Sequence, residues 1–425
     1  MGNSLLINFS PSGDIHLPSS KSLGHRALIC AGLAAAGPEP GESILLNAGA
    51  GLSEDLAATC AALPCFGAEA ELRGGKFSVR RAAGSGPKVI DCGESGSSLR
   101  FLLPLAAVLN QGRTVFTGRG RLLERPLTAY AEIFAGSGLE FQQNQAEVSV
   151  EGRLKAGHYH LPGNVSSQFV SGLLLALPLT GGDSVIELTT NLESAPYVDL
   201  TLEVMNVFGI NVERPAEKLF FIPGRQHYRP ATYRLEADYS QAAFFLAAGA
   251  LGCSARCHGL NPDSLQGDRA IIDIVSQMGA EITWSEGTLA AKSTDRLKAL
   301  TIDAREIPDL VPVLAALGAL AEGVTRIINA GRLRLKESDR LHAMFLELNK
   351  LGTEVHEETE ALIINGKASL PGGVSVESHN DHRVAMALAV ASLGCLKPIM
   401  INGSDCVNKS YPLFWDDFGR HQRTG

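Results

Sequence analysis

The chain has 425 residues, 45% hydrophobic and 19% charged, and its 37 basic and 45 acidic side chains give a formal net charge of −8. This length and apolar content suit roughly two or three globular domains, which excludes a disordered chain and a small disulfide-stapled scaffold. The acidic balance and the 6% aromatic content argue against a nucleic-acid coat or a membrane-surface protein, because those functions need a basic face or stacking residues.

Cysteine usage and the apolar runs indicate where the protein works. The eight cysteines lie mostly in apolar stretches and form no C-x-x-C pair, so we expect reduced thiols in a cytoplasmic protein. The N-terminal residues lack the basic region of a signal peptide. Apolar runs are broken by Gly or Pro before they reach the ~20 residues of a bilayer span, so we predict no transmembrane segment.

Two series of glycine-terminated segments recur along the chain with a period of about 71 residues. The first series is apolar nearly all round and predicts six buried helices, at residues 26–37, 99–112, 167–181, 240–252, 311–323 and 382–394. The second series is amphipathic and ends at Gly67, Gly138, Gly209, Gly279, Gly352 and Gly419. Glycine at the end of a helix is typical of a left-handed C-cap.

Short β-rich runs separate these helices, for example residues 43–48, 184–190 and 398–403. The period therefore predicts six copies of one α/β unit, each with two helices and several strands. Such a unit is too long for a solenoid repeat and too short for a domain, so several copies must share a core. Three copies per domain is the natural grouping.

The residues directly before the buried helices carry the chemistry. They are rich in Ser, Asp and Asn, which ordinary N-capping explains, but helix N-termini also bind anions. Cations at or near helix starts need another explanation, because a charge beside an apolar helix is costly without a partner. The pattern favours a cationic cluster for an anionic ligand, drawn from Lys21, Arg26, Arg100 and Arg383 at the buried helices and Arg125, Arg340 and Lys409 near the second series.

Two acidic segments are ambiguous on sequence alone. Lys336 and Arg340 are four residues apart at the start of a second-series helix and would share a face, with Glu337 three before Arg340. A surface salt-bridge run explains them equally well. Asp309 lies just before an apolar helix, where N-capping is the ordinary role and catalysis the alternative.

Ten collinear motifs resemble those of the 5-enolpyruvylshikimate-3-phosphate synthase family, over residues 16–415. They are LPSSKS…R, ESGSSLR, LLERP, VSSQF, ESAPY, EADYSQ, IPD, LKESDR, NDHR and NKSYP. The resemblance implies an α/β fold: a two-domain inverse α/β barrel with three βαβαββ units per domain and the active site in the interdomain cleft. It also implies that residues 1–20 and 237–425 form one domain and residues 21–236 the other.

The resemblance implies transfer of the enolpyruvyl (1-carboxyvinyl) group of phosphoenolpyruvate to the 5-hydroxyl of shikimate 3-phosphate, with release of inorganic phosphate. This is a step of the shikimate pathway to chorismate and the aromatic amino acids, and glyphosate is the family inhibitor. Shikimate 3-phosphate would be bound by Lys21, Ser22, Arg26, Ser166, Ser167, Gln168, Ser194, Asp309 and Lys336. Phosphoenolpyruvate would be bound by Lys21, Gly96, Arg125, Gln168, Arg340, Arg383 and Lys409, with Arg100 in support.

The resemblance also assigns the proton transfers. Asp309 would be the base toward the 5-hydroxyl, oriented by Lys336, and Glu337 and Lys21 are the two candidates for the acid at the methylene carbon. Some positions depart from the commonest family pattern: Glu94 and Ser97 flank Gly96, Phe101 replaces a frequent Pro, and Arg332 stands where some members have Asn. Gly96 leaves room for phosphoenolpyruvate, but these departures leave glyphosate sensitivity open.

Other functions fit less well. The sister transferase acting on UDP-N-acetylglucosamine shares the scaffold but typically has a cysteine near residues 113–124, where this chain has none. RNA 3′-phosphate cyclase is disfavoured by the acidic balance, and a non-catalytic anion-binding protein gains nothing from Asp309 and Glu337. His158-x-His160 and Cys253-x-x-x-Cys257 lack a companion pair at zinc spacing, so we predict no metal and no cofactor. We expect a monomer that binds its small-molecule substrates but neither nucleic acid nor membrane.

Overall fold

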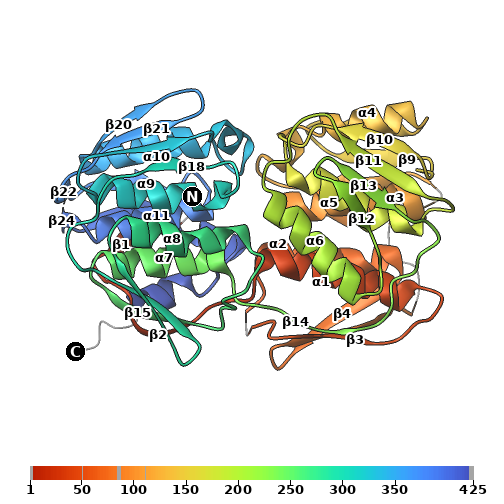
Figure 1. Cartoon of the computed structure of the whole chain (residues 1–425), viewed down its shortest axis with the longest axis horizontal. Helices are drawn as coiled ribbons and strands as arrows, with labels where there is room; N and C mark the ends of the chain where they lie inside the picture. Colours follow the sequence, from red (N-terminus) through yellow and green to blue (C-terminus); the bar gives the residue numbers. More distant parts are fainter. Residues whose placement is uncertain (1–2, 50, 84–87, 111, 421–425) are drawn as a thin grey trace. The chain divides into compact units, whose positions relative to one another are not determined.

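The computed structural model describes residues 3–49, 51–83, 88–110 and 112–420. The chain divides into two compact units, which we call unit 1 (Met1–Pro18 with Glu236–Gly425) and unit 2 (Ser19–Leu235). Each unit has its own hydrophobic core. Within each unit the helices lie inside and the sheets lie outside (Figure 1). Among the described residues, no helix is long and apolar enough to cross a bilayer.

Six buried helices form the centres of the two cores. Every residue of α7 and α9 is buried, and α1, α3, α5 and α11 are exposed only near their ends. Their bounds are α1 Lys21–Ala36, α3 Gly96–Leu109 and α5 Ser167–Ala176 in unit 2, and α7 Tyr239–Ala250, α9 Val311–Leu320 and α11 His382–Ser392 in unit 1. The six buried helices predicted from the first glycine series are confirmed.

The second series is also confirmed as helical, with one exposed side on each α-helix. It comprises α2 Glu54–Ala62, α4 Thr128–Gly136, α6 Ala195–Val207, α8 Ile271–Gln277, α10 Arg340–Leu351 and the π-helical turn Asp416–Arg420. All six glycines of this series have positive φ, between 74° and 111°. The expected left-handed cap is therefore correct for the second series.

The left-handed cap is wrong for four glycines of the first series. Only Gly252 and Gly323 have positive φ there, whereas Gly37 is extended with ψ of −178°. Lack of space for a side chain explains the glycine at one of these four positions, because a Cβ on Gly394 would lie 2.2 Å from Leu320 Cδ2. Packing against the side chain of Leu320, at the end of α9, therefore favours a glycine at that position without a left-handed backbone.

Five four-stranded sheets share one topology, with the first two strands parallel and the remaining pairs antiparallel. In unit 2 they are, in spatial order, β14 (Thr232–Arg234), β3 (Ser43–Leu46), β5 (Lys76–Arg81) and β4 (Ala68–Arg73); β6 (Val89–Asp91), β7 (Thr114–Thr117), β9 (Val148–Glu151) and β8 (Glu140–Gln143); and β10 (His158–Leu161), β11 (Ser184–Leu188), β13 (Leu219–Ile222) and β12 (Glu213–Ala216). In unit 1 they are β2 (Ser12–His16), β15 (Ser254–His258), β17 (Thr288–Lys292) and β16 (Glu281–Ser285); and β18 (Thr301–Asp303), β19 (Val324–Ile328), β21 (Leu362–Asn365) and β20 (Glu354–Glu357).

The sixth copy is shorter. Its sheet pairs β23 (Ser375–Glu377) in parallel with β25 (Ile399–Asn402), and β1 (Leu5–Ile7) occupies the third place, antiparallel to β25. A separate two-stranded sheet pairs β22 (Leu370–Gly372), which precedes β23, with β24 (Cys395–Lys397), which precedes β25. Five copies with four-stranded sheets and a shorter sixth copy, three copies in each unit, confirm the two-domain α/β fold class.

The leading strand of two copies comes from a distant part of the chain. The strand that precedes α1 in sequence is β2, yet β2 pairs with β15 in unit 1. Its place beside β3 in unit 2 is taken by β14, more than 200 residues after β2 in the sequence. In each unit, therefore, one sheet is completed by a strand that lies next to a point where the chain passes from one unit to the other.

Candidate active site

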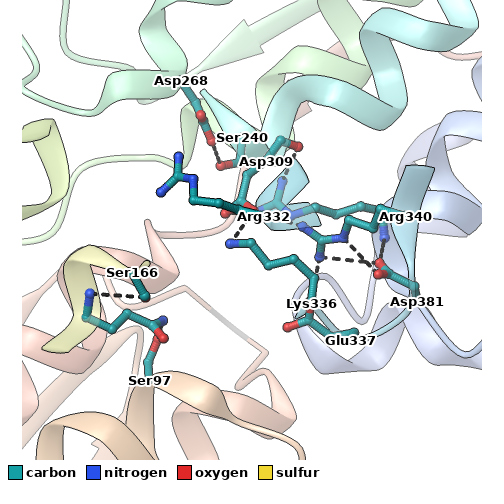
Figure 2. A network of polar contacts seen from close by, with 12 residues as sticks. Ser97, Ser166, Ser240, Asp268, Asp309, Arg332, Lys336, Glu337, Arg340 and Asp381 are labelled. Atoms are coloured by element: carbon teal, nitrogen blue, oxygen red, sulfur yellow. Dashed lines mark hydrogen bonds and ion pairs between the residues drawn. The ribbon is translucent and has the colours of Figure 1, made fainter. Parts of the chain in front are cut away.

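A cluster of charged side chains in unit 1 forms where three helices begin. Asp309 lies in the short 3-10 turn Pro308–Leu310 before α9, Arg340 is the first residue of α10, and Arg383 is the second residue of α11. Asp309 Oδ1 accepts a hydrogen bond from Arg340 Nη1 at 2.9 Å, and its Oδ2 accepts one from Arg383 Nη2 at 3.1 Å. Figure 2 shows Asp309 and Arg340 within this network. The sequence-predicted base and two predicted cations thus meet directly.

The protonation of Asp309 follows from its neighbours. Burial raises the pKa of this carboxyl, but the positive charges of Arg383, Lys336 and Arg340 outweigh burial and hold the pKa well below its usual range. Asp309 is therefore ionised at neutral pH. Its role is not N-capping, because the N-cap residue of α9 is Leu310 and no side chain caps that helix.

Arg340 is the central cation of this cluster, and only 1% of it is exposed. Its Nε donates to Asp381 Oδ2 at 2.8 Å and its Nη2 donates to Glu337 Oε2 at 2.7 Å, in addition to the bond with Asp309. Burial lowers the pKa of Arg340, but the three carboxylates more than compensate and raise it above the usual value. Arg340 therefore positions Asp309 and Glu337, the two carboxylates of the predicted reaction, on one guanidinium.

Asp381 was missed by sequence reasoning, although it lies inside the NDHR motif. It is fully buried and caps α11 by accepting from Arg383 N at 2.9 Å. It also accepts a hydrogen bond from Ser338 Oγ at 3.1 Å. One carboxylate thus orients both Arg340 and the start of α11. The signal was an Asp directly before a buried helix, which alone suggests only a cap.

The helical reading of Lys336 is wrong. The N-cap of α10 is Asp339, and Lys336 ends the preceding 3-10 turn Gly331–Leu335 with extended backbone angles. Lys336 nevertheless reaches the same carboxylate oxygen as Arg340, with Nζ 3.5 Å from Asp309 Oδ1. Burial lowers the pKa of Lys336, opposed by the charge of Asp309 and reinforced by that of Arg340. The alternative of a salt-bridge run is therefore partly correct: Lys336 forms an ion pair, but its partner is Asp309 of the charged cluster.

Two further polar groups border this cluster. Lys409, at the end of the 3-10 helix Ser404–Lys409, donates to Asn380 O at 2.6 Å, next to Asp381 in sequence. Asp268, which sequence reasoning also missed, accepts a hydrogen bond from Ser240 Oγ (Figure 2). Burial, together with the negative charge of Asp309, raises the pKa of Asp268 to about 6.

Unit 2 carries a second group of predicted residues at the starts of α3 and α5. Gly96 is the first residue of α3, and a Cβ added to it would lie 2.8 Å from Nη1 of both Arg100 and Arg125. Gln168 of α5 accepts from Arg100 Nη1 at 2.9 Å and donates to Ser97 Oγ at 3.0 Å. Two guanidiniums therefore flank the N-terminus of α3, which suits an anion.

The close pairing of α3 with α5 holds this group in place. Gly172 of α5 faces the backbone of α3, and a Cβ there would lie 2.4 Å from Arg100 O. Tyr130 of α4 donates to the same carbonyl at 2.7 Å. Ser166 caps α5 by accepting from Gln168 N at 3.3 Å, and Ser167, the first residue of the helix, is buried.

The start of α1 forms a third group. Lys21 Nζ lies 2.8 Å from Asp55 Oδ2 of α2, a partner that sequence reasoning missed. Arg26 is buried and donates to Thr201 Oγ1 and Tyr197 O of α6, both at 2.7 Å. Its guanidinium lies 5.0 Å from the ring centre of Phe101.

The third group also includes Ser22 and Ser194, which lie at the starts of α1 and α6. Burial lowers the pKa of Arg26 to about 10. The backbone carbonyl of Ser22 accepts a hydrogen bond from Arg26 Nη1 at 2.7 Å. Ser194, the residue before α6, has a left-handed φ of 56°. Arg26 thus ties α1 to α6.

The predicted residues therefore gather in three groups: one in unit 1 around Asp309 and two in unit 2, around Gly96 and around Lys21. Each group combines helix N-termini with Lys or Arg side chains. Together they offer an ionised base, a second carboxylate and several cations for phosphate and carboxylate groups. This inventory suits general acid–base chemistry on anionic substrates.

Comparisons with known proteins agree with this chemistry. Residues 10–418 match the family described as EPSP synthase (3-phosphoshikimate 1-carboxyvinyltransferase). The 3-phosphoshikimate 1-carboxyvinyltransferase of Clostridium acetobutylicum is 48% identical over 413 residues, covering 95% of this chain and 94% of that protein. The enzyme of the same name from Clostridium kluyveri is 47% identical, covering 96% and 94%.

Solved structures give the same result. The EPSP synthase from Acinetobacter baumannii has a TM-score of 0.78 and 27% identity, covering 98% of both chains. The enolpyruvyl transferase NikO from Streptomyces tendae also has a TM-score of 0.78, but at 19% identity this likeness shows the fold alone. The sequence match over nearly the whole length decides the family: this chain belongs to the EPSP synthase (3-phosphoshikimate 1-carboxyvinyltransferase) family.

Proposed function

We propose that this protein transfers the enolpyruvyl group of phosphoenolpyruvate to the 5-hydroxyl of shikimate 3-phosphate and releases inorganic phosphate. The observation that carries the proposal is the pair of carboxylates, Asp309 and Glu337, bonded to the one buried guanidinium of Arg340. A protein that only binds anions gains nothing from two carboxylates among its cations. A reaction that moves protons while it binds phosphates needs both.

The reaction divides into proton transfers that these residues suit. The 5-hydroxyl oxygen bonds to C2 of phosphoenolpyruvate as its proton leaves and the methylene carbon gains a proton. Phosphate then departs as the new methyl group loses a proton. Asp309 is the proposed base, because its low pKa keeps it ionised, and Lys336 orients it from 3.5 Å. Glu337 and Lys21 remain the candidates for the acid.

Substrate binding is proposed for the residues already grouped. Shikimate 3-phosphate would contact Ser22, Arg26, Ser166, Ser167, Gln168 and Ser194 of unit 2, with Lys21, Asp309 and Lys336. Phosphoenolpyruvate would contact Gly96, Arg125 and Gln168 of unit 2, Arg340, Arg383 and Lys409 of unit 1, and Lys21. The proposed domains are residues 1–20 with 237–425, and residues 21–236.

Phosphate release tests this function. Release from phosphoenolpyruvate should require shikimate 3-phosphate and should not occur with UDP-N-acetylglucosamine. Asp309→Asn should keep most substrate affinity while turnover falls by about two orders of magnitude or more. Asp303→Asn is the matched control, because Asp303 pairs with Arg305 on the surface and outside the cluster. Absence of release with either acceptor would leave only an anion-binding role.

We also propose that the protein works as a cytoplasmic monomer on these small molecules alone. None of the eight cysteines forms a disulfide, and burial raises the pKa of several thiols, including those of Cys60 and Cys257 to about 12. Thiols in this state suit a reducing compartment. Light scattering after size exclusion should give the mass of one 45.0 kDa chain.

A further inference from the structure

Three metal-ligating side chains outside the candidate active site meet on the outer face of one sheet of unit 2. His158 and His160 alternate along strand β10, so both point to the exposed face while Tyr159 and Leu161 are buried. Glu187 lies opposite His160 in the register of the parallel neighbour β11. Both strands are labelled in Figure 1. The sequence prediction of no metal rested on the lack of a companion pair at zinc spacing, whereas the fold brings one carboxylate, that of Glu187, to the two histidines.

The geometry of these three residues is already compact. Glu187 Oε2 lies 2.9 Å from His158 Nε2 and 3.6 Å from His160 Nδ1, and one ligand atom from each residue fits within 4.8 Å of the others. The imidazole rings lie side by side, with centres 4.4 Å apart and planes inclined by 32°. A divalent ion with bonds of about 2.0–2.2 Å holds its ligand atoms about 3–3.5 Å apart, so small side-chain rotations would suffice.

We propose that His158, His160 and Glu187 bind a divalent transition-metal ion, with Zn²⁺ as the best-matched ion. Two imidazoles and one carboxylate form a donor set that zinc accepts, and a water molecule can complete the tetrahedron. The side chains are 51%, 56% and 47% exposed, which leaves the ion an open path and the fourth position accessible. Because the ligands come from two strands, the ion would join β10 to β11.

The proposed metal is structural and has no part in the transfer reaction. The strand β10 leads directly to Ser166 and α5, so the ion would stabilise the sheet that precedes this helix. Binding to the folded chain raises its thermal stability by mass action. Removal of the metal should therefore lower the melting temperature and leave the phosphate release unchanged.

Titration of Zn²⁺ into the chelator-treated full chain tests the site. Calorimetry should show one ion per chain at micromolar or tighter affinity, and H160A should weaken it by more than about tenfold. The matched control is H356A, which removes an exposed imidazole with a single carboxylate partner, Glu354 Oε1 at 3.3 Å. It should bind zinc like the unmodified chain.

A second measurement guards against loss of folding in the variant. Zn²⁺ should raise the melting temperature of the unmodified chain and of H356A, but not that of H160A, whose melting temperature without metal should be unchanged because His160 is exposed. Equal zinc affinity in H160A would show that the ion binds elsewhere on the chain and would overturn the proposal. Absence of zinc binding by the unmodified chain would also overturn it and leave a surface ion pair.

Discussion

At the scale of single residues, shared partners set the chemistry of the candidate site. Arg340 holds Asp309 and Glu337 on one guanidinium, and Asp381 holds that guanidinium from the other side. A buried cation surrounded by carboxylates fixes the positions of all of them, and removal of one partner leaves a buried charge uncompensated. The environment of a side chain, more than its type, therefore decides its role here.

Gly96 gives a prediction at this scale. A methyl group in Gly96→Ala would meet the flexible ends of Arg100 and Arg125 at 2.8 Å, so folding should survive while the two cations move. We expect the KM for phosphoenolpyruvate to rise about tenfold or more, with a much smaller change for shikimate 3-phosphate. Steady-state kinetics measure this. Gly181→Ala, which has open space around its Cβ, is the control, and unchanged kinetics in Gly96→Ala would remove Gly96 from the site.

Asp268 gives a pH-dependent prediction. Its folded pKa of about 6 lies above the ordinary 3.8, so the protonated carboxyl contributes stability that is complete at acidic pH and lost as the pH rises through about 6. Asp268→Asn should therefore gain stability relative to the unmodified protein between pH 4 and pH 7, by about 3 kcal/mol. Urea unfolding at several pH values measures the difference. Parallel stability curves for the two proteins would contradict this assignment.

At the scale of elements, close helix pairing sets which side chains meet. The contact of α3 with α5 depends on Gly172, since a side chain there would meet both Arg100 O and the hydroxyl of Tyr130. That contact brings Gln168 to Arg100 and Ser97. The second glycine series acts differently, through positive φ at helix ends. Glycine therefore permits close helix packing at Gly172 and a left-handed backbone at the helix ends of the second series.

Gly172→Ala tests the helix pairing. A Cβ 2.4 Å from the backbone of α3 cannot be relieved by rotation of a side chain, so the helices must separate. We expect the free energy of unfolding to fall by about 1–3 kcal/mol, with a loss of phosphoenolpyruvate affinity because Gln168 moves. Gly136→Ala in α4 is the matched helical control, since nothing lies within 4 Å of its Cβ. Equal stability of the two variants would show that α3 and α5 tolerate the separation.

At the scale of the whole molecule, the two units differ in how the chain builds them. Unit 2 is one continuous segment, Ser19–Leu235. The strand that pairs in parallel with β3 is β14, at the C-terminal end of that segment. Unit 1 needs β1 and β2 from the N-terminal residues, although the rest of it begins at Glu236. Two sheets of unit 1 are incomplete without those strands.

This difference predicts unequal folding of fragments. A fragment of residues 19–235 should unfold cooperatively by itself, whereas residues 236–425 should not, because two of their sheets would expose open edges. Circular dichroism and thermal unfolding of both fragments measure this. Addition of a peptide of residues 1–18 should restore cooperative unfolding to the second fragment, and independent cooperative folding of residues 236–425 would refute the prediction.

The sequence by itself determined the repeating architecture, because each helix and strand can be recognised from residues that lie close together along the chain. It located all six buried helices, the second helical series and the strands between them, and its motifs led to the family. It also placed Arg340 and Arg383 at helix starts. These features are local, and so a linear pattern records them.

Only the tertiary structure decided which distant residues meet. The partnership of Arg340 with Asp381, that of Lys21 with Asp55, and the arrival of Glu187 beside two histidines all join segments from different elements. The exchange of β2 and β14 between copies is equally invisible to the period, because strand pairing depends on where the chain crosses. Electrostatics follows the same rule, since the low pKa of Asp309 arises from cations of two other segments, Lys336 with Arg340 and Arg383, that the fold brings to its carboxylate.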